Sequence, residues 1–251
     1  MKSLDHITHI MFDVGGTLAN DEPSYADGYA AMLTGLGYPA TGADYRQASD
    51  GAKDDVEEPP RELEAFRVWR EGYNRAIIRR LGVPEAKLDE VRAAMKKRFR
   101  YYSNAYAYPE SRFVLRSLRW AGYDVAIISN IQPVLPDLLL DLDLMRYASF
   151  AIASDTFGAQ KPDRSIFDEA IRLAKVDPKN VIYVGDSLQA DVMGSSQIGI
   201  TPVLIDRGGH VTDEQLAEYG GFRVGNLVEL LDRLGVDPWN EEWLHDPSRI
   251  R

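Results

Sequence analysis

The sequence contains no cysteine. Disulfides, thiolate metal sites and cysteine nucleophiles are therefore excluded. The chain also lacks any apolar run close to the roughly 20 residues that cross a bilayer. Its first residues mix charged and apolar side chains too finely for the core of a signal peptide. We therefore expect a soluble protein of the cytoplasm.

Positive charge is scarce relative to negative charge. The 251 residues include 29 Lys and Arg against 39 Asp and Glu, which gives a formal net charge of −10. A nucleic-acid backbone requires a concentrated basic face, and an anionic membrane surface is disfavoured for the same reason. We therefore expect neither nucleic acid nor a membrane as a partner. A hydrophobic share of 45% with 27% charged residues is typical of a globular protein.

Short apolar runs that end at small or acidic residues predict buried parallel strands. They cover residues 9–13, 124–129, 181–186 and 201–206, with a weaker run at 150–154. Between them, segments such as 111–122 and 165–175 carry apolar residues every three or four positions, which is typical of helices. Strands that alternate with helices predict an α/β fold with a Rossmann-like, doubly wound parallel sheet. The ligand crevice of such a sheet lies beyond the carboxyl ends of its strands.

The interval between the first and second predicted strands is far longer than one crossover helix requires. Within it, apolar residues at helical spacing mark two helix faces, at Leu63, Phe66, Tyr73 and Ile77 and at Leu88, Val91, Met95, Phe99 and Tyr102. The acidic segment 52–60 ends in two prolines and predicts an exposed connection. We therefore predict a core domain of residues 1–19 and 107–251, with an inserted helical domain of residues 20–106.

The end of the first strand brings an aspartate to the predicted crevice. In FDVGGTL, Asp13 follows the strand, and Gly15 and Gly16 then turn the chain. A carboxylate at this place is a candidate nucleophile, because its attack on phosphorus gives an aspartyl phosphate. Ser129 and Asn130 close the second strand, and their hydroxyl and amide are candidates to hold the oxygens of a phosphoryl group.

Two later segments add charged side chains. Lys161, in GAQKPDRSIF, precedes a predicted helix and is a candidate to neutralise both the nucleophile and the phosphate. In VGDSLQAD, Asp186 ends a strand and Asp191 follows five residues later, so that one carboxylate can bind a hard cation while the other braces it. Each segment alone also fits an ordinary turn, cap or solvated lysine. The interpretation therefore depends on the occurrence of all four segments, those of Asp13, Ser129, Lys161 and Asp186, in this order along the chain.

The ordered set DVGGT, SN, KP and GDSxxxD resembles the four motifs of the haloacid dehalogenase superfamily, over residues 10–205. The resemblance implies a phosphatase of small phosphorylated metabolites with Asp13 as nucleophile, Ser129 as a phosphate donor and Lys161 as the ordering charge. It implies Mg²⁺ held by Asp13 and Asp186, with Asp191 as a further ligand or its support. It also implies that the inserted helices form a cap that closes over the substrate.

One position departs from the phosphatases of that superfamily. Two residues past their nucleophile they carry a second aspartate, a general acid and then a base, whereas this chain has Gly15. The backbone carbonyl of Gly15 can still bind the metal, as the resemblance implies. However, glycine transfers no proton, and positioned acid–base catalysis typically contributes about 10²–10⁴ in rate. Asp21 and Glu22 are candidate substitutes by position alone. We expect low activity, with a preference for aryl or acyl phosphates.

Other catalytic functions are alternatives. Dehalogenases of the superfamily also lack the second aspartate, but they usually lack GDSxxxD, so dehalogenation is disfavoured. Phosphonoacetaldehyde hydrolases use a cap lysine as a Schiff base. Lys53 is the sole early candidate here, and its acidic neighbours would keep the amine protonated. DVGGT also resembles the phosphate-binding turn of actin-like sugar kinases, but residues 18–32 predict loop and helix rather than the second strand of that fold.

A non-catalytic phosphate- or metal-binding module is the alternative from another class, and Gly15 supports it. The retained nucleophile, lysine and metal carboxylates argue against it, because buried charges are costly and a sheet crevice does not need them for stability. Metal-dependent trapping of an aspartyl phosphate, or of its fluoride mimic, separates the two. The substrate itself depends on how the cap side chains are arranged in space.

Overall fold

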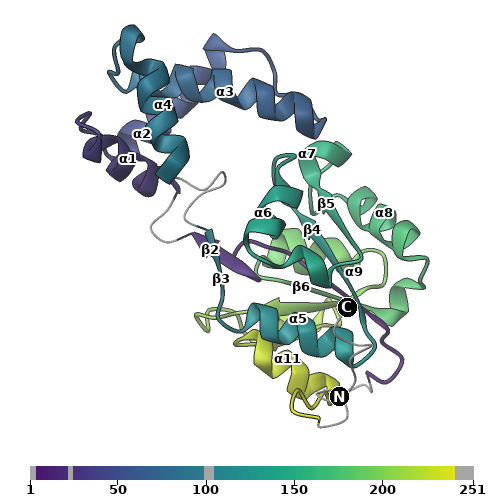
Figure 1. Ribbon diagram of the computed structural model, residues 1–251. Coiled ribbons are helices and arrows are strands. Elements are labelled where there is room, and N and C mark those ends of the chain that lie inside the picture. Colours follow the sequence, from purple (N-terminus) through teal and green to yellow (C-terminus); the bar gives the residue numbers. More distant parts are fainter. Residues whose placement is uncertain (1–3, 22–24, 99–104, 241–251) are drawn as a thin grey trace. The chain divides into compact units, whose positions relative to one another are not determined.

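The computed structural model describes residues 4–21, 25–98 and 105–240 (Figure 1). The chain divides into two compact units, one of Met1–Asn20 with Ala107–Arg251 and the other of Asp21–Tyr106. The chain passes between them along two short strands, β2 (Ala19–Asp21) and β3 (Ala105–Ala107), which pair with each other. None of the described helices is both long and apolar enough to cross a membrane.

A six-stranded parallel sheet forms the centre of the larger unit, in the order β5-β4-β1-β6-β7-β8. Its strands are β1 (His9–Phe12), β4 (Asp124–Ser129), β5 (Phe150–Ala153), β6 (Val181–Gly185), β7 (Thr201–Ile205) and β8 (Phe222–Val224). The sheet confirms the predicted α/β fold, and the apolar runs of the sequence supply its first five strands. Because the strands are parallel, the carboxyl ends of β4, β1 and β6 lie side by side at one edge.

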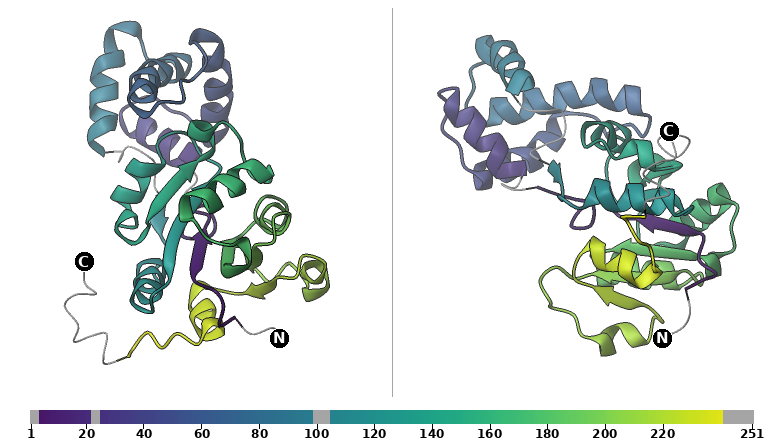
Figure 2. Two further views of the ribbon diagram at one scale, coloured as in Figure 1. Left: turned by 90° about the vertical axis from the view of Figure 1, so that its right-hand side faces the viewer. Right: turned by 60° about the horizontal axis from the view of Figure 1, so that its bottom comes forward.

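Helices cover both faces of this sheet (Figure 2). Helix α5 (Ser111–Trp120) contacts α11 (Leu227–Leu234), and α8 (Arg164–Ala174) contacts α9 (Gly194–Ser196). The remaining helices are α6 (Leu135–Asp141), α7 (Ser154–Phe157) and α10 (Asp213–Ala217), the π-helix η5 (Leu188–Met193) and the 3-10 turns η3 (Met145–Tyr147) and η4 (Pro178–Asn180).

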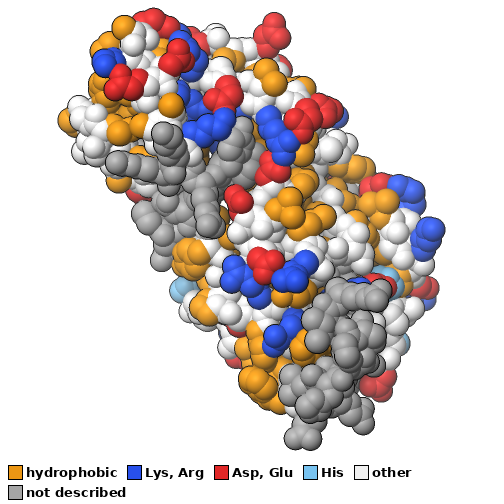
Figure 3. Space-filling model, in the orientation of Figure 1, with side chains coloured by type: hydrophobic (Ala, Val, Ile, Leu, Met, Phe, Trp, Pro, Cys, Tyr) orange, Lys and Arg blue, Asp and Glu red, His pale blue; other side chains and the backbone are white. Residues whose placement is uncertain are grey.

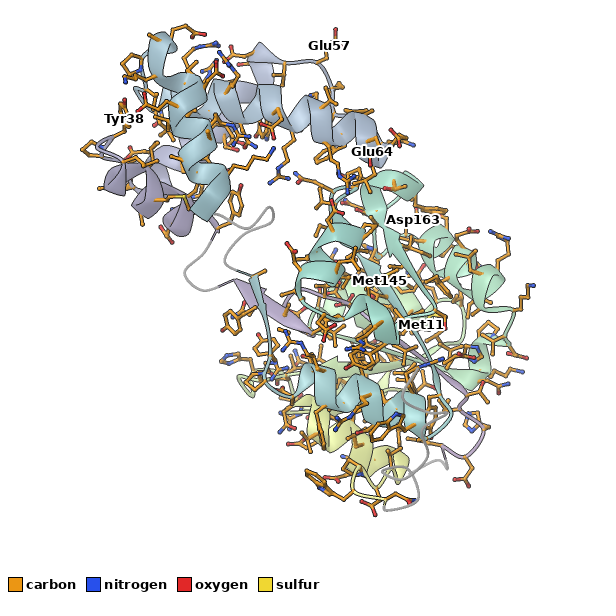
Figure 4. The ribbon with its side chains drawn as sticks, in the orientation of Figure 1. Met11, Tyr38, Glu57, Glu64, Met145 and Asp163 are labelled. Atoms are coloured by element: carbon orange, nitrogen blue, oxygen red, sulfur yellow. The ribbon has the colours of Figure 1, made fainter. Side chains whose placement is uncertain are left out.

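Helix α8 shows how the local sequence fixes an element. Asp163, labelled in Figure 4, accepts a hydrogen bond from the backbone N–H of Ser165 at 2.8 Å and so caps the first turn. On the buried face of the helix, Ile166 and Phe167 belong to the same apolar cluster as Tyr183 of β6. The ring centroids of Phe167 and Tyr183 lie 5.1 Å apart, edge to face.

The smaller unit is helical. It contains α1 (Tyr25–Gly35), α2 (Gly42–Ala52), α3 (Leu63–Arg80) and α4 (Leu88–Arg98), with 3-10 turns η1 (Lys53–Asp55) and η2 (Glu85–Lys87). Of the apolar residues that predicted α3 and α4, five are buried, Phe66, Ile77, Leu88, Val91 and Met95. Leu63 and Tyr73 are half-buried, while Phe99 and Tyr102 lie outside the described residues. On the face drawn in Figure 3, Lys and Arg side chains lie beside Asp and Glu side chains.

Candidate active site

Three of the predicted site residues lie at neighbouring strand ends. Asp13 follows β1, Ser129 ends β4 and Asp186 follows β6. The backbone N–H of Asp13 still donates to the carbonyl of Val184 at 2.9 Å, so the aspartate is held at the edge of the sheet by β6. Residues more than a hundred positions apart in the chain therefore meet because their strands pair.

Lys161 is the centre of the site. Its ammonium donates to Oδ1 of Asp13 at 2.7 Å, to Oδ1 of Asp191 at 2.6 Å and to the hydroxyl of Tyr183 at 2.8 Å. The lysine is only 3% exposed. A lysine ammonium has three protons, so these three contacts use its full capacity as a donor. The amine is thereby fixed in position and cannot swing toward solvent.

The charges around Lys161 shift its acid–base equilibrium. Burial works against the ammonium, but the carboxylates of Asp13 and Asp191 outweigh that effect and raise the pKa of Lys161 above its ordinary value. Burial raises the pKa of Asp13, the charge of Lys161 lowers it by less, and Asp191 raises it further. The lysine is therefore a fixed positive charge at neutral pH, and the aspartate is more basic than a solvated one.

Asp191 is anchored at both carboxylate oxygens. Oδ1 accepts from Lys161, and Oδ2 accepts from the backbone N–H of Ser187 at 2.9 Å. The hydroxyl of Ser187 in turn accepts from the backbone N–H of Ala190 at 3.0 Å, at the start of η5. This turn brings Asp191 back to the end of β6. These contacts favour the supporting role of Asp191 among the two that the sequence allows.

The two glycines after the nucleophile differ in whether a residue with a side chain could replace them. Gly16 has a φ of +67°, and a Cβ at this position would collide with the carboxylate of Asp186, so only glycine fits. Gly15 has an ordinary φ, and apart from Gly15 and its two chain neighbours no atom of the described part of the chain lies within 4 Å of a Cβ built there. The turn therefore requires glycine at position 16, whereas position 15 has room for a side chain.

The carboxylates of Asp13, Asp186 and Asp191 fit a divalent cation. Each offers an oxygen, and these atoms lie within 4.8 Å of one another. Three carboxylates against one lysine leave an excess of negative charge. Partial desolvation of the Asp186 carboxylate, with the charges of Asp13 and Asp191, raises the pKa of Asp186 to about 6. A hard dication such as Mg²⁺ would relieve this repulsion through oxygen ligands of the kind it prefers.

The two expected phosphate donors differ in their surroundings. Ser129 is buried at the end of β4, and its hydroxyl makes no hydrogen bond to any described residue, which leaves it available. The amide of Asn130, which we expected to hold phosphate oxygens, contacts the backbone of Lys161 instead. It donates to the carbonyl of Lys161 at 2.8 Å and accepts from its N–H at 2.7 Å. Asn130 therefore positions the lysine.

The sequence did not single out Tyr183. Its hydroxyl accepts from Lys161 and donates to the carbonyl of Ile128 at 2.9 Å, inside the sheet. The side chain is fully buried, and burial raises its pKa well above the ordinary value, so it stays a neutral donor. In the pattern VIYVG, a tyrosine is indistinguishable from a core residue. Only the position of Lys161 in the folded protein shows that the hydroxyl of Tyr183 accepts a hydrogen bond from the lysine.

Arg207 is a second residue that the sequence did not single out. Its guanidinium donates to the carbonyl of Thr17 at 3.1 Å and lies 3.4 Å from that of Gly16. It also donates to Oε1 of Glu110 at 2.7 Å, and its central carbon lies 3.5 Å from the ring centroid of Tyr108. Arg207 thus stabilises the turn that follows the nucleophile through contacts to its backbone carbonyls. The sequence offered one signal for Arg207, because this residue directly follows Asp206, the acidic end of a predicted strand.

The remaining candidates belong to the smaller unit or its boundary. Lys53 is exposed and pairs with Asp50 at 2.9 Å, which raises its pKa, as expected for a solvated ammonium rather than a Schiff-base amine. The backbone of Asp21 belongs to β2, but its side chain is not described, and Glu22 lies outside the described residues. No described contact therefore supports either acid as a substitute for the missing aspartate.

Known proteins resemble this chain in sequence and in fold. A family model for haloacid dehalogenase-like hydrolases matches residues 7–199. A phosphoglycolate phosphatase of Pseudomonas putida is 29% identical over 203 residues, which are 76% of this chain and 66% of that protein. A phosphoserine phosphatase of Thermus thermophilus is 30% identical over 174 residues, which are 67% of this chain and 68% of that protein. The chain thus spans about two thirds of the length of each.

A solved structure shows the same fold. The crystal structure of a HAD phosphatase from Thermococcus onnurineus superposes with a TM-score of 0.61 at 22% identity. The superposition covers 92% of this chain and 100% of that one.

Proposed function

The chain belongs to the haloacid dehalogenase-like hydrolases, and on this premise we propose that it is a Mg²⁺-dependent phosphatase that acts through an aspartyl phosphate on Asp13. The observation that carries the proposal is the cluster in which one buried lysine joins two carboxylates beside a third. Buried charges of this kind are costly to desolvate, and they are concentrated at functional sites. The substrates in the names of the two relatives, phosphoglycolate and phosphoserine, support a small phosphorylated metabolite.

The first step forms a bond between a carboxylate oxygen of Asp13 and phosphorus, while the ester bond to the leaving group breaks. Lys161 holds Oδ1 of Asp13 at 2.7 Å and so fixes the orientation of the nucleophile. The same ammonium, with the available hydroxyl of Ser129, stabilises negative charge on the phosphoryl oxygens. Asn130 and Tyr183 hold the lysine in place through its backbone and its amine.

Asp13 and Asp186 would hold Mg²⁺ through their carboxylates and Gly15 through its backbone carbonyl, with Asp191 as support. When bound, the ion would supply positive charge that stabilises the phosphoryl group. Asp191 keeps the lysine near the nucleophile, since its two oxygens are already engaged by Lys161 and Ser187.

The leaving group departs without a proton from position 15, because Gly15 has none to give. We therefore expect efficient release only of groups that are stable as anions, such as phenolates and carboxylates. In the second step a water attacks the phosphorus of the aspartyl phosphate, breaks its bond to Asp13 and releases inorganic phosphate. The unit Asp21–Tyr106 would act as the cap. The proposal places the enzyme in the cytoplasm.

A phosphatase screen tests the proposal directly. The protein is incubated with Mg²⁺ and with aryl phosphates, sugar phosphates and nucleotides, with Asp13→Asn as the matched control. Mg²⁺-dependent release of phosphate by the wild type alone would support it. Trapping with beryllium fluoride, a mimic of the aspartyl phosphate, is the second measurement. If the wild type binds Mg²⁺ but neither releases phosphate nor traps the mimic, the chain is a binding module and the proposal is wrong.

A further inference from the structure

The loop that follows β7 carries Arg207 to the turn behind the nucleophile. Asp206 closes this loop, because its carboxylate accepts from the backbone N–H groups of His210 at 3.0 Å and of Val211 at 2.8 Å. The backbone N–H of Asp206 also donates to the carbonyl of Val224 in β8 at 2.8 Å. In the sheet, β6 lies between β7 and β1, so a residue of this loop needs a long side chain to reach the turn that follows β1.

The guanidinium of Arg207 joins three segments of the larger unit. It contacts the carbonyls of Gly16 and Thr17 in the turn. It also pairs with the carboxylate of Glu110, just before α5, and lies over the ring of Tyr108, just after β3. A guanidinium is a rigid plane with donors at fixed angles, so the contacts to Glu110 and Tyr108 also fix the N–H groups that face the turn. The Arg207 side chain is only 26% exposed, so these contacts are partly shielded from water.

The carbonyl of Gly15 differs from those beside it. The neighbouring carbonyls accept hydrogen bonds from groups of the larger unit, those of Val14, Gly16, Thr17 and Leu18. The carbonyl of Gly15 accepts none from any residue that the structure describes. The turn is therefore held on both sides of Gly15, while the oxygen that the proposed function assigns to Mg²⁺ stays available.

The turn also touches the carboxylates of the metal site. Gly16 packs so closely on Asp186 that a Cβ at position 16 would collide with the carboxylate. Asp13 is held to β6 by the hydrogen bond from its backbone N–H to Val184. The sheet thus positions the carboxylates, whereas the carbonyl of Gly15 depends on the turn. Mg²⁺ requires near-octahedral geometry with oxygens at about 2.0–2.1 Å, so a small shift of the turn would misplace one ligand.

We propose that Arg207 is a positioning residue of the metal site, which holds the turn so that the carbonyl of Gly15 faces the same cation as the carboxylates. The inference rests on the proposed function, which supplies the Mg²⁺. The positive charge of Arg207 by itself opposes a dication, so removal of that charge alone should strengthen Mg²⁺ binding. Positioning predicts the opposite sign, because residues that orient metal ligands typically contribute about 10–100-fold in metal affinity.

Calorimetric titration of the full chain with Mg²⁺ at constant ionic strength tests this sign. Arg207→Met keeps an apolar stem over Tyr108 and removes the guanidinium, and it should raise the Kd for Mg²⁺ about tenfold or more. Arg207→Lys keeps the charge but lacks the planar fork, and it should also weaken binding, though by less. Arg172→Met is the charge-matched control, because it removes an exposed arginine of α8 that also pairs with a carboxylate. It should bind Mg²⁺ at least as tightly as the wild type.

A second control separates position from stability. Leu230→Ala empties a fully buried site in α11 of the same unit, and it should lower the midpoint of urea unfolding but keep the wild-type affinity for Mg²⁺. Hydrogen exchange in the absence of metal adds a readout of the turn itself. The backbone amides of Leu18 and Ala19, which donate to Val14 across the turn, should exchange several-fold faster in Arg207→Met than in Leu230→Ala.

The outcomes distinguish this inference from the proposed function. A folded Arg207→Met that binds Mg²⁺ as tightly as the wild type would overturn the inference and leave the proposed function intact. Equal losses of affinity in Arg207→Met and Leu230→Ala would do the same. Should Arg207→Met not fold, wild-type affinity in Arg207→Lys would overturn the inference. A wild type that binds no Mg²⁺ would refute the proposed function and this inference together. Since binding needs no turnover, the affinities decide even where no phosphatase activity is found.

Discussion

Gly15→Asp should supply the carboxylic acid that the turn after the nucleophile lacks. Gly15 has an ordinary φ, and among the described residues other than Gly15 and its chain neighbours no atom lies within 4 Å of a Cβ at that position. The Cβ of the new side chain therefore meets no atom beyond the residues adjacent in the chain. We expect the free energy of unfolding to change by less than about 1 kcal/mol, because the backbone conformation already suits a residue with a side chain.

The gain in rate follows from the proton that the new carboxyl can transfer. Positioned acid–base catalysis contributes about 10²–10⁴ in rate. Since open space at position 15 leaves the new side chain unrestrained, we expect the lower end, about 10², which corresponds to about 2.7 kcal/mol in activation free energy. The gain should be large for alkyl phosphates and small for nitrophenyl phosphate, whose leaving group needs little protonation.

The assay measures kcat/KM with Mg²⁺ for a series of phosphate monoesters of graded leaving-group pKa. The wild type should show a steep dependence on that pKa, and Gly15→Asp a flatter one. Gly16→Ala is the structural contrast, because its methyl group would collide with Asp186 at a φ of +67°. It should lose activity and about 1–3 kcal/mol of stability. A folded, Mg²⁺-binding Gly15→Asp with unchanged rates, or a wild type with a flat dependence, would refute the reasoning.

Three further predictions concern the charged cluster. Lys161→Met should lower the free energy of unfolding by about 3–5 kcal/mol in urea denaturation, because Asp13 and Asp191 would be left buried without their cation. Tyr183→Phe should cost about 1–3 kcal/mol in the same assay and leave the fold intact, since only the hydrogen bonds of one hydroxyl are lost. Mg²⁺ affinity should fall about tenfold per pH unit below pH 6 and level off above it, because Asp186, with its pKa raised to about 6, must lose its proton to bind the metal.

Each of these predictions can be refuted, and the first has a matched control. Lys179→Met removes an exposed lysine and should change stability by less than about 0.5 kcal/mol. A Lys161→Met protein as stable as Lys179→Met would show that the buried pair contributes nothing. A Tyr183→Phe protein with wild-type stability would show that the hydroxyl hydrogen bonds are not needed. Calorimetric Mg²⁺ titrations between pH 5 and pH 8 test the predicted pH dependence of Mg²⁺ affinity. A constant affinity over this range would exclude Asp186 as a metal ligand with a pKa of about 6.

The sequence predicts most of the larger unit because its signals are local. Apolar runs of four to six residues between turn residues predict five of the six strands, and parallel order follows from the helices between them. Three short strands were missed. β8 (Phe222–Val224) has three residues and an arginine at its centre, and β2 (Ala19–Asp21) lies in a segment that predicts a loop. β3 (Ala105–Ala107) also has only three residues. None of the three is long enough to show a period of two.

The sequence by itself determined the family, the fold and which polar residues reach the sheet edge, because parallel strands place their carboxyl ends together. Tertiary structure alone decided what each side chain contacts. Asn130 faces the backbone of Lys161, and Tyr183 donates within the sheet, because β4 and β6 flank β1. In the helical unit, Asn74 and Arg92 line one cavity although they lie on separate helices. Contacts of this kind depend on how helices and strands pack against one another. The periodicity of a single helix or strand does not indicate that packing.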